Sequence, residues 1–436
     1  MQHFPAVVKV AFIGAGSIEF TRNVVTDLCS YPELRSGLHL ALYDISPERL
    51  GFAEALARRI VAQTGANAVV SASAERLLAL DRADFVINEV QVGGYASTLT
   101  DFEIPARYGV RQTIGDTLGI GGIFRGLRTI PVVVALAEDM LRACPQAYLL
   151  NYSNPMAMLP WAVYAGTGFS NVFGLCHSVR DTHALLAGLV GIEAADVTFV
   201  TAGFNHQAFV LRFEANGESL YPRLTEVIDG SADLQRRVRV ELFRRFGYFP
   251  TESSEHSAEY VPWFMRHQDQ VERYRIFVGD YLGRSRDNLD ELDALQAQLK
   301  AGADLELEPT DELASQFIHS IETGTAREIY VNVRNGDLIT NLPADCCVEV
   351  PCDLNGSAAV PKQVGALPPQ LAALNRTFLN VAELTVHAAL ESSRDRVYQA
   401  ALLDPNTSAT LTVGQTVAMV DELLLAHAPL LPPALR

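Results

Sequence analysis

The fold is decided by one stretch near the start of the chain, Val7-Val8-Lys9-Val10-Ala11-Phe12-Ile13-Gly14-Ala15-Gly16-Ser17. Its first part is a mostly apolar run, which is typical of a strand buried in a parallel sheet. The glycines that follow predict a tight turn into a helix that ends near Cys29. Glycine is needed in such a turn when the backbone must approach a pyrophosphate closely.

Gly14, Gly16 and Ser17 therefore indicate a dinucleotide site at this turn. The third glycine of the usual pattern is replaced by Glu19, which leaves the phosphate-facing part of the motif intact. Asp44 ends the next apolar run, where a carboxylate can accept hydrogen bonds from a ribose and would repel a 2′-phosphate. We expect NAD in preference to NADP. A tight turn that binds no ligand is the alternative for the glycines taken alone.

Strand and helix signals alternate over the first 150 residues, which predicts a parallel sheet with helices on both faces. Ser46 and Pro47 predict a helix start, and Gly65 predicts where that helix stops. The predicted strands after the first are Leu38–Tyr43, Ala68–Ala72, Phe85–Val90 and Tyr148–Leu150.

From Asn151 onward the pattern becomes mixed. It predicts strands at Val172–Leu175 and Val197–Thr201, a hairpin over Ile329–Val350, a crossing between layers over Val350–Pro369 and a helical tail over Pro368–His427. The expected fold is α/β, with an N-terminal Rossmann domain over residues 1–195 and a C-terminal mixed α/β domain over residues 196–436.

Composition excludes several classes of function. The net charge is −17, and no cluster of Lys and Arg offsets it, so a nucleic acid or an acidic membrane surface is not expected as a partner. No apolar run is long enough to span a membrane, and Met1–Pro5 is too short for a signal peptide. The six cysteines lack the spacing of a secreted disulfide scaffold, which favours a reducing cytoplasm.

Two polar residues further along the chain are candidates for a functional site. Asp116 is the single acid in the glycine-rich stretch Gln112–Gly122, and flexible backbone around one carboxylate suits a catalytic loop. A helix-capping Asp is an equally good interpretation. Asn154 lies just beyond a strand, at the sheet edge where α/β enzymes bind ligands. It is either an N-cap before Pro155 or a contact for a substrate hydroxyl.

Cys176 and His177 end one predicted strand and His206 ends the next, so all three could come within reach of one metal ion. A cysteine after an apolar strand is more often a small buried hydrophobe. Further along, the segment Glu252–Tyr260 predicts a helix start on which His256, Glu259 and Tyr260 share a face. Their spacing alone favours a solvated polar face.

Taken together, the ordered motifs of the chain resemble glycoside hydrolase family 4, the NAD- and divalent-metal-dependent glycosidases built on a lactate-dehydrogenase-like fold. The resemblance covers nearly the whole chain. The motifs are Gly14-Ala15-Gly16-Ser17, Gln91-Val92-Gly93-Gly94-Tyr95, Gly115-Asp116-Thr117, Asn154-Pro155, Gly174-Leu175-Cys176-His177-Ser178, Asn205-His206, Asn341-Leu342-Pro343, Val348-Glu349-Val350-Pro351 and Leu403-Asp404-Pro405.

The resemblance implies roles for individual residues. It makes Cys176 and His206 the metal ligands, usually for Mn²⁺, and Asp116 the catalytic acid. Asn154 and His177 match contacts to substrate hydroxyls. The base maps less securely, and the resemblance leaves Tyr260 and His256 as candidates. It also implies that the C-terminal domain carries substrate, metal and subunit contacts, in a homodimer or homotetramer.

The implied chemistry is a glycosidase reaction that passes through an oxidised sugar. Oxidation at C3 by NAD acidifies the C2 proton, and a base removes that proton. The C1–O bond then breaks by elimination, water adds and the hydride returns. NAD-dependent members of this family are known exceptions to the two-carboxylate scheme of glycosidases. A Cys and His pair should favour Zn²⁺ or Co²⁺ over Mn²⁺, a mismatch that sugar oxygens at open positions would ease.

The family divides between phosphorylated and plain glycosides. Gln91 and His177 resemble the plain-sugar branch, where α-galactosidases are most similar, since phosphoglycoside members are expected to have Arg near position 91 and Asn or Asp at position 177. An α-glucosidase or an α-galacturonidase is the alternative within the family. Outside it, the alternatives are an NAD-dependent dehydrogenase of a hydroxy acid or sugar, and an NAD-binding protein without catalysis.

Overall fold

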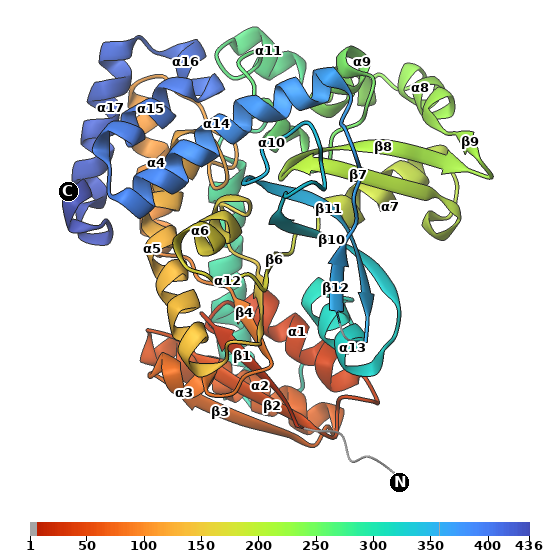
Figure 1. Ribbon diagram of the computed structural model, residues 1–436, viewed down its shortest axis with the longest axis vertical. Helices are drawn as coiled ribbons and strands as arrows, with labels where there is room; N and C mark the ends of the chain where they lie inside the picture. Colours follow the sequence, from red (N-terminus) through yellow and green to blue (C-terminus); the bar gives the residue numbers. More distant parts are fainter. Residues whose placement is uncertain (1–6, 357) are drawn as a thin grey trace.

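The computed structural model describes residues 7–356 and 358–436, so the segment Met1–Pro5 lies outside the described residues. One sheet runs through the molecule, with twelve strands in the order β3-β2-β1-β4-β5-β6-β10-β11-β7-β8-β9 and β12 beside β11 (Figure 1). In chain order the strands are β1 Val8–Ile13, β2 Leu38–Tyr43, β3 Ala68–Ser73, β4 Phe85–Asn88, β5 Tyr148–Asn151, β6 Val172–Gly174, β7 Thr198–Phe204, β8 Gln207–Ala215, β9 Glu218–Ser219, β10 Arg327–Arg334, β11 Cys347–Asn355 and β12 Ala358–Pro361.

The first half of the sheet is parallel. Strands β3, β2, β1, β4, β5 and β6 are neighbours in that order, which is the strand order of a Rossmann fold. Ile13 pairs with Tyr43 on one side and with Asn88 on the other, so the strands end level with one another. This register places the residues that follow each strand at one edge of the sheet, where α/β proteins bind their ligands.

The second half of the sheet is antiparallel. Strand β10 pairs with β6 through Asn332 and Gly174, and β11 pairs with β7 through Glu349 and Gly203. Strands β7 and β8 then form a hairpin whose turn is Asn205 and His206. The expected α/β fold, with a Rossmann unit first and a mixed unit after it, is confirmed.

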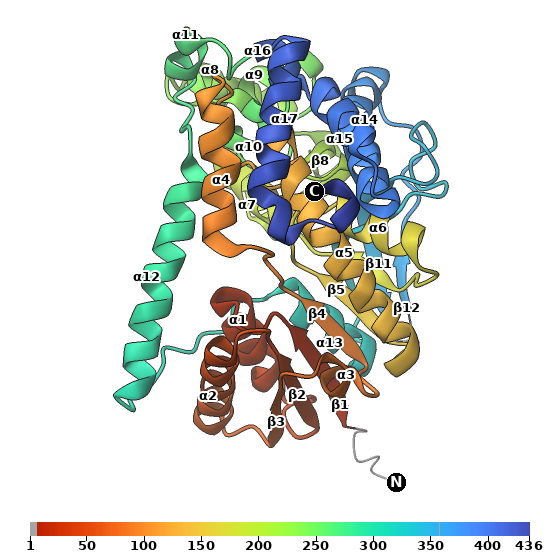
Figure 2. The same cartoon turned by 90° about the vertical axis from the view of Figure 1, so that its left-hand side faces the viewer.

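Helices cover both faces of the sheet (Figures 1 and 2). They are α1 Ile18–Ser30, α2 Pro47–Thr64, α3 Arg76–Leu80, α4 Gly94–Arg107, α5 Gly119–Ala143, α6 Met158–Gly166, α7 Ser178–Val190, α8 Tyr221–Asp229, α9 Val238–Phe246, α10 Ser254–Glu259, α11 Gln268–Arg273, α12 Asp280–Lys300, α13 Leu313–Thr323, α14 Pro369–Glu391, α15 Arg394–Leu403, α16 Pro405–Thr410 and α17 Val413–His427.

The helices also connect distant parts of the chain. Helix α13 packs against α1, and α12 runs along one side of the molecule past α4 and α2 (Figure 2). The division into residues 1–195 and 196–436 stays a prediction. The predicted tail is four helices, α14 to α17. The predicted crossing at Val350–Pro369 is wrong in its first part, because β11 turns there into β12.

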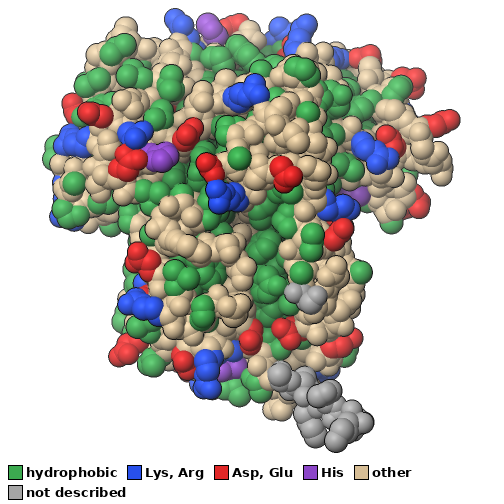
Figure 3. All heavy atoms as spheres, viewed as in Figure 1, with side chains coloured by type: hydrophobic (Ala, Val, Ile, Leu, Met, Phe, Trp, Pro, Cys, Tyr) green, Lys and Arg blue, Asp and Glu red, His purple; other side chains and the backbone are tan. Residues whose placement is uncertain are grey.

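Helix α5 is long and apolar enough to cross a membrane by length and composition alone, but 78% of its most apolar window is buried inside the protein. It packs against α14 and α6 within the apolar core. On the face drawn in Figure 3, Lys and Arg side chains are interspersed with Asp and Glu.

Candidate active site

The glycine turn after β1 leaves no room for side chains. Gly14 has a φ of +86°, and a Cβ added there would lie 3.0 Å from the Val90 nitrogen. A Cβ on Gly16 would lie 2.7 Å from Asp44 Oδ2. The Gly16 N–H donates to this same Oδ2 at 2.9 Å, and the Ser46 N–H donates to Oδ1 at 2.8 Å. These bonds hold the Asp44 carboxylate against the turn, and each oxygen keeps a lone pair for another donor.

The turn therefore fits a dinucleotide. Ser17 is the N-cap residue of α1, and its side chain makes no capping hydrogen bond. A carboxylate at the end of β2 and a backbone cradle at the N-terminus of α1 are the two features that a ribose and a pyrophosphate require.

Asp116 is buried in the glycine-rich loop, where its two oxygens have different partners. Oδ1 accepts a hydrogen bond from Thr117 Oγ1 at 2.8 Å, and Oδ2 accepts one from Asn154 Nδ2 at 2.7 Å. Burial acts to raise the pKa of Asp116, but the charges of Arg125, His256 and His206 outweigh it and leave that pKa below its usual value. The helix-capping interpretation is wrong, because α5 begins after Leu118 and has no side-chain cap.

Asn154 follows β5 and points its amide at Asp116. The N-cap interpretation of Asn154 is wrong as well, because α6 begins at Met158 with Ala157 at its N-cap. Within the described residues, Asn154 Oδ1 is buried without a hydrogen-bond partner. A buried acceptor without a partner is costly, so this atom is suited to a ligand hydroxyl.

Strands β6 and β7 bring Cys176 and His206 together, although β10 and β11 lie between these strands in the sheet. A ligand atom from each of these side chains and from Glu252 lies within 4.8 Å of the other two. Burial, with Glu349 and Glu252 nearby, raises the pKa of the Cys176 thiol well above its usual value. A bound divalent cation would reverse that shift, because it stabilises the thiolate.

His206 also belongs to a second group of this kind, with Asp116 and His256, whose ligand atoms again lie within 4.8 Å of one another. Near His206, the carboxylate of Glu349 accepts hydrogen bonds from Asn205 Nδ2 at 2.9 Å and Asn332 Nδ2 at 3.2 Å. Burial raises the pKa of Glu349 to about 7.

The segment around α10 is buried, so the prediction of a solvated polar face is wrong. His256 Nδ1 lies 2.6 Å from the Tyr260 hydroxyl. Burial, with His206 nearby, lowers the pKa of His256 to about 4, which keeps the imidazole neutral at pH 7. Glu259 faces the glycine-rich loop, where its carboxylate accepts hydrogen bonds from the backbone N–H groups of residues 113, 114 and 115.

Comparison with known protein families identifies the family to which the chain belongs. Residues 9–192 match the description "Family 4 glycosyl hydrolase", and residues 201–407 match "Family 4 glycosyl hydrolase C-terminal domain". The chain belongs to family 4 of the glycosyl hydrolases. The resemblance carried by the ordered motifs is thereby confirmed.

Two relatives cover almost the whole of this family 4 glycosidase. The α-galactosidase of Bacillus subtilis strain 168 is 41% identical over 429 residues, which are 97% of this chain and 99% of the relative. The α-galactosidase of Rhizobium meliloti strain 1021 is 34% identical over 443 residues, 97% of this chain and 89% of the relative.

A solved structure shares the fold of this glycosidase. It is the 6-phospho-β-glucosidase of Thermotoga maritima with manganese, NAD⁺ and glucose-6-phosphate, at a TM-score of 0.80 and 21% identity. The match covers 97% of this chain and 99% of the other.

His177 lies outside both groups of candidate metal ligands in this glycosidase. Its Nε2 lies 2.8 Å from Glu312 Oε2, which also accepts a hydrogen bond from the Tyr152 hydroxyl at 3.0 Å. A quarter of the His177 side chain is exposed, at 25%. Glu312 therefore orients His177, which is not among the candidate metal ligands.

Sequence reasoning assigned no role in the site to three of its residues. Glu252 lies beside the Cys176 and His206 pair, Glu259 binds the glycine-rich loop, and Glu312 orients His177. Glu312 is 135 residues from its partner, so no local spacing could have indicated it. The one available signal was the Glu252–Tyr260 segment, whose several acids and histidine were attributed to a polar surface.

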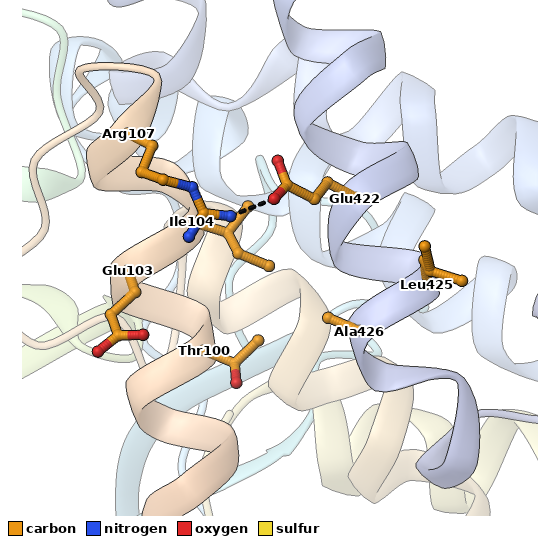
Figure 4. Close-up of a pocket in the computed structure, with 7 residues that line it drawn as sticks. All are labelled: Thr100, Glu103, Ile104, Arg107, Glu422, Leu425 and Ala426. Atoms are coloured by element: carbon orange, nitrogen blue, oxygen red, sulfur yellow. Dashed lines mark hydrogen bonds and ion pairs between the residues drawn. The ribbon is translucent and has the colours of Figure 1, made fainter.

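A separate surface hollow lies between α4 and α17 of the glycosidase (Figure 4). Arg107 and Glu422 form an ion pair across it, and Leu425 lies on its rim with 77% of its surface exposed. The hollow contains none of the residues described above.

Proposed function

We propose that this family 4 glycosidase hydrolyses a non-phosphorylated α-glycoside, with an α-galactoside as the favoured substrate. The α-galactosidase relatives at 41% and 34% identity support this substrate. The observation that carries the proposal is the convergence of a glycine cradle, a Cys and His pair and the buried Asn154 acceptor at one edge of the sheet.

NAD is the proposed dinucleotide, held at Gly14, Gly16, Ser17 and Asp44, and Mn²⁺ or another divalent cation is the proposed metal, held by Cys176 and His206. The dinucleotide supplies reversible oxidation at C3 of the sugar. The cation supplies Lewis-acid stabilisation of charge on the neighbouring sugar oxygens.

The residues of the chain position the sugar and move its protons. Asn154 Oδ1 accepts a hydrogen bond from a sugar hydroxyl, and His177, fixed by Glu312, contacts another. Asp116 is the acid that serves the leaving oxygen. It must first take up a proton, because its surroundings favour the carboxylate.

The base that removes the C2 proton is one of two buried side chains, His256 or Tyr260. The two side chains share a hydrogen bond at 2.6 Å, so either can hold the proton that the other releases. Hydrolysis in deuterium oxide separates these roles, because removal of the C2 proton introduces deuterium at C2 of the product. Of Tyr260→Phe and His256→Gln, the variant that loses the base should lose this exchange most. Undiminished exchange in both variants would place the base elsewhere.

The function is tested with reductant-treated protein on 4-nitrophenyl α-galactoside, α-glucoside, α-galacturonide and the β-anomers of the two neutral sugars. Each reaction is run with and without NAD⁺ and Mn²⁺, and both nitrophenol and NADH are followed. We expect nitrophenol release that requires both additions, without net NADH, and that is fastest with the α-galactoside. Net NADH without cleavage would instead indicate a dehydrogenase.

We further propose that the enzyme is cytoplasmic and forms a homodimer or homotetramer. The absence of a disulfide among the six cysteines, all free and buried, is compatible with a reducing compartment. Light scattering of the purified protein measures the subunit count.

A further inference from the structure

Glu252 is held beside the Cys176 and His206 pair by the loop before α10. This loop is tied to β8, the strand that begins just after His206, by a hydrogen bond from the Thr251 N–H to the Ala208 carbonyl at 2.8 Å. Glu252 itself has a φ of +68°, a left-handed conformation that is uncommon for a residue other than glycine. The chain therefore fixes this carboxylate next to the proposed metal ligands.

The carboxylate of Glu252 is available to a ligand. Its titratable and charged neighbours are His256, His206, Arg239 and Asp116, and no hydrogen bond or ion pair joins its side chain to another described residue. Cys176 Sγ and a ring nitrogen of His206 lie within 4.8 Å of one of its oxygens. A half-buried carboxylate that no protein group pairs with can bind a ligand without losing a protein contact.

The tautomer of His206 leaves its other nitrogen free. Thr117 Oγ1 has one proton, which it donates to Asp116 Oδ1 at 2.8 Å. Its lone pair then accepts a hydrogen from His206 Nδ1 at 3.1 Å. In the neutral imidazole, His206 Nε2 is then the nitrogen with the lone pair for a cation, and the chain from Asp116 through Thr117 orients the ring as second partners of metal-binding histidines do.

The other group around His206 is less suited to a cation. Both oxygens of Asp116 already accept hydrogen bonds, and His256 Nδ1 already contacts the Tyr260 hydroxyl. That group also lacks the Cys176 thiolate, whereas Glu252 makes no hydrogen bond with a described residue and lies with Cys176 in the same group.

We propose that Glu252 is the third protein ligand of the divalent cation, together with Cys176 and His206. This inference rests on the proposed function, which assigns the cation to those two residues. A carboxylate is a hard oxygen donor, so it shifts the preference of a site with a thiolate and an imidazole toward Mn²⁺. Its charge, added to that of the thiolate, also neutralises the two charges of the ion.

The test measures cation binding on metal-depleted enzyme without NAD or sugar. Mn²⁺ affinity is determined by titration with electron paramagnetic resonance, and Zn²⁺ affinity by competition with a chelator. Co²⁺ is added separately, because its thiolate absorption band reports whether Cys176 binds the ion. The variant is Glu252→Gln, which keeps the shape of the side chain, and the matched control is Glu255→Gln, a half-buried carboxylate in α10 outside both candidate groups.

We expect Glu252→Gln to weaken Mn²⁺ binding by at least about tenfold, since even outer partners of metal ligands cost about 10- to 100-fold. Zn²⁺ binding should weaken less, and the cobalt–thiolate band should persist. Glu255→Gln should bind Mn²⁺ like the wild type. Circular dichroism and NAD⁺ affinity check folding, and Glu252→Asp, which keeps the charge, should recover part of the Mn²⁺ affinity.

Unchanged Mn²⁺ affinity in Glu252→Gln, with a higher KM for the glycoside, would overturn the inference and make Glu252 a substrate contact. A loss confined to His256→Gln would also overturn it by placing the cation on the other side of His206. Failure of the proposed function gives a different result. The wild type then binds no Mn²⁺, or Cys176→Ser binds it as tightly as the wild type.

Discussion

The carboxylate of Glu259 holds the glycine-rich loop in place, which makes Glu259→Gln an informative change. Its Oε2 accepts hydrogen bonds from the N–H groups of Thr113 at 2.8 Å and Ile114 at 3.2 Å, and its Oε1 accepts one from Gly115 at 2.9 Å. A glutamine has the same shape but only one acceptor oxygen. Its NH₂ group would face at least one of these N–H groups, and that donor would be left buried without a partner.

Leaving one buried donor without a partner costs about 1–3 kcal/mol. Local opening of the loop should therefore become about 5- to 150-fold more frequent, since each 1.36 kcal/mol is a factor of ten. Hydrogen–deuterium exchange of the amides at Thr113, Ile114 and Gly115 measures this opening. Because Asp116 follows directly, a displacement of about 1 Å would lower kcat by about 100-fold.

Glu255→Gln is the matched control, because the Glu255 side chain lies in the same helix and none of the loop hydrogen bonds ends on it. It should leave both the exchange rates and kcat near their wild-type values. If Glu259→Gln exchanged its loop amides at the wild-type rate and kept its kcat, the carboxylate would not hold the loop, and the reasoning would be refuted.

Changes at three further residues test other parts of the structure. Asp44→Ala should weaken NAD⁺ binding by about 10- to 100-fold, because hydrogen bonds to a charged acceptor contribute about 1.5–3 kcal/mol, and calorimetry with NAD⁺ measures the loss. Arg128→Met should lower the free energy of unfolding by up to about 3–5 kcal/mol, because it removes the guanidinium paired at 2.7 Å with Asp101 in the core and leaves that carboxylate only His427 as a buried partner. Urea titration would show it, and an unchanged midpoint would contradict it. Asp404 caps α16 through the Thr407 N–H at 2.8 Å, so Asp404→Ala should cost about 0.5–2 kcal/mol, whereas Asp404→Asn keeps an acceptor. Burial raises the pKa of Asp404 from 3.8 to about 6, so the folded protein holds this proton more tightly than the unfolded chain and loses stability as pH rises through that interval. The stability of Asp404→Asn relative to wild type should therefore increase by up to about 3 kcal/mol from pH 4 to pH 6 and then level off, as urea titrations at several pH values would show.

The Rossmann half of the fold could be predicted because its signals are local. The strand at Val8–Ile13, the turn at Gly14 and the helix start at Ser46 each follow from a few adjacent residues, and the structure has all of them. The order of the parallel strands then follows from the connection rules of such folds.

The site was predicted where motifs end strands and was missed where it depends on tertiary contacts. Cys176 and His206 lie together as expected, although β10 and β11 separate their strands. Burial of His256 and Glu259 could not be inferred from spacing, because polar residues on a short helix look the same whether they face water or a loop. The N-cap interpretation of Asn154 failed for a similar reason, since the residue bonds to Asp116, which is 38 residues away.

The parallel and antiparallel halves of the sheet are joined by a short stretch of strand pairing. Strand β6 meets β10 through the pair of Gly174 and Asn332, and a Cβ on Gly174 would lie 2.8 Å from the Asn332 Cβ. Exchanging C-terminal halves between relatives, to move sugar specificity from one enzyme to another, would join strands of different parents at this point. Such chimaeras should fold only when the half that contains β6 has glycine at the position of Gly174 and the half that contains β10 keeps an acceptor equivalent to Glu349, whose carboxylate binds the Asn332 amide. Compatibility of the two parents at the contact between β6 and β10, more than similarity of their catalytic residues, would then decide which pairs of enzymes can be recombined.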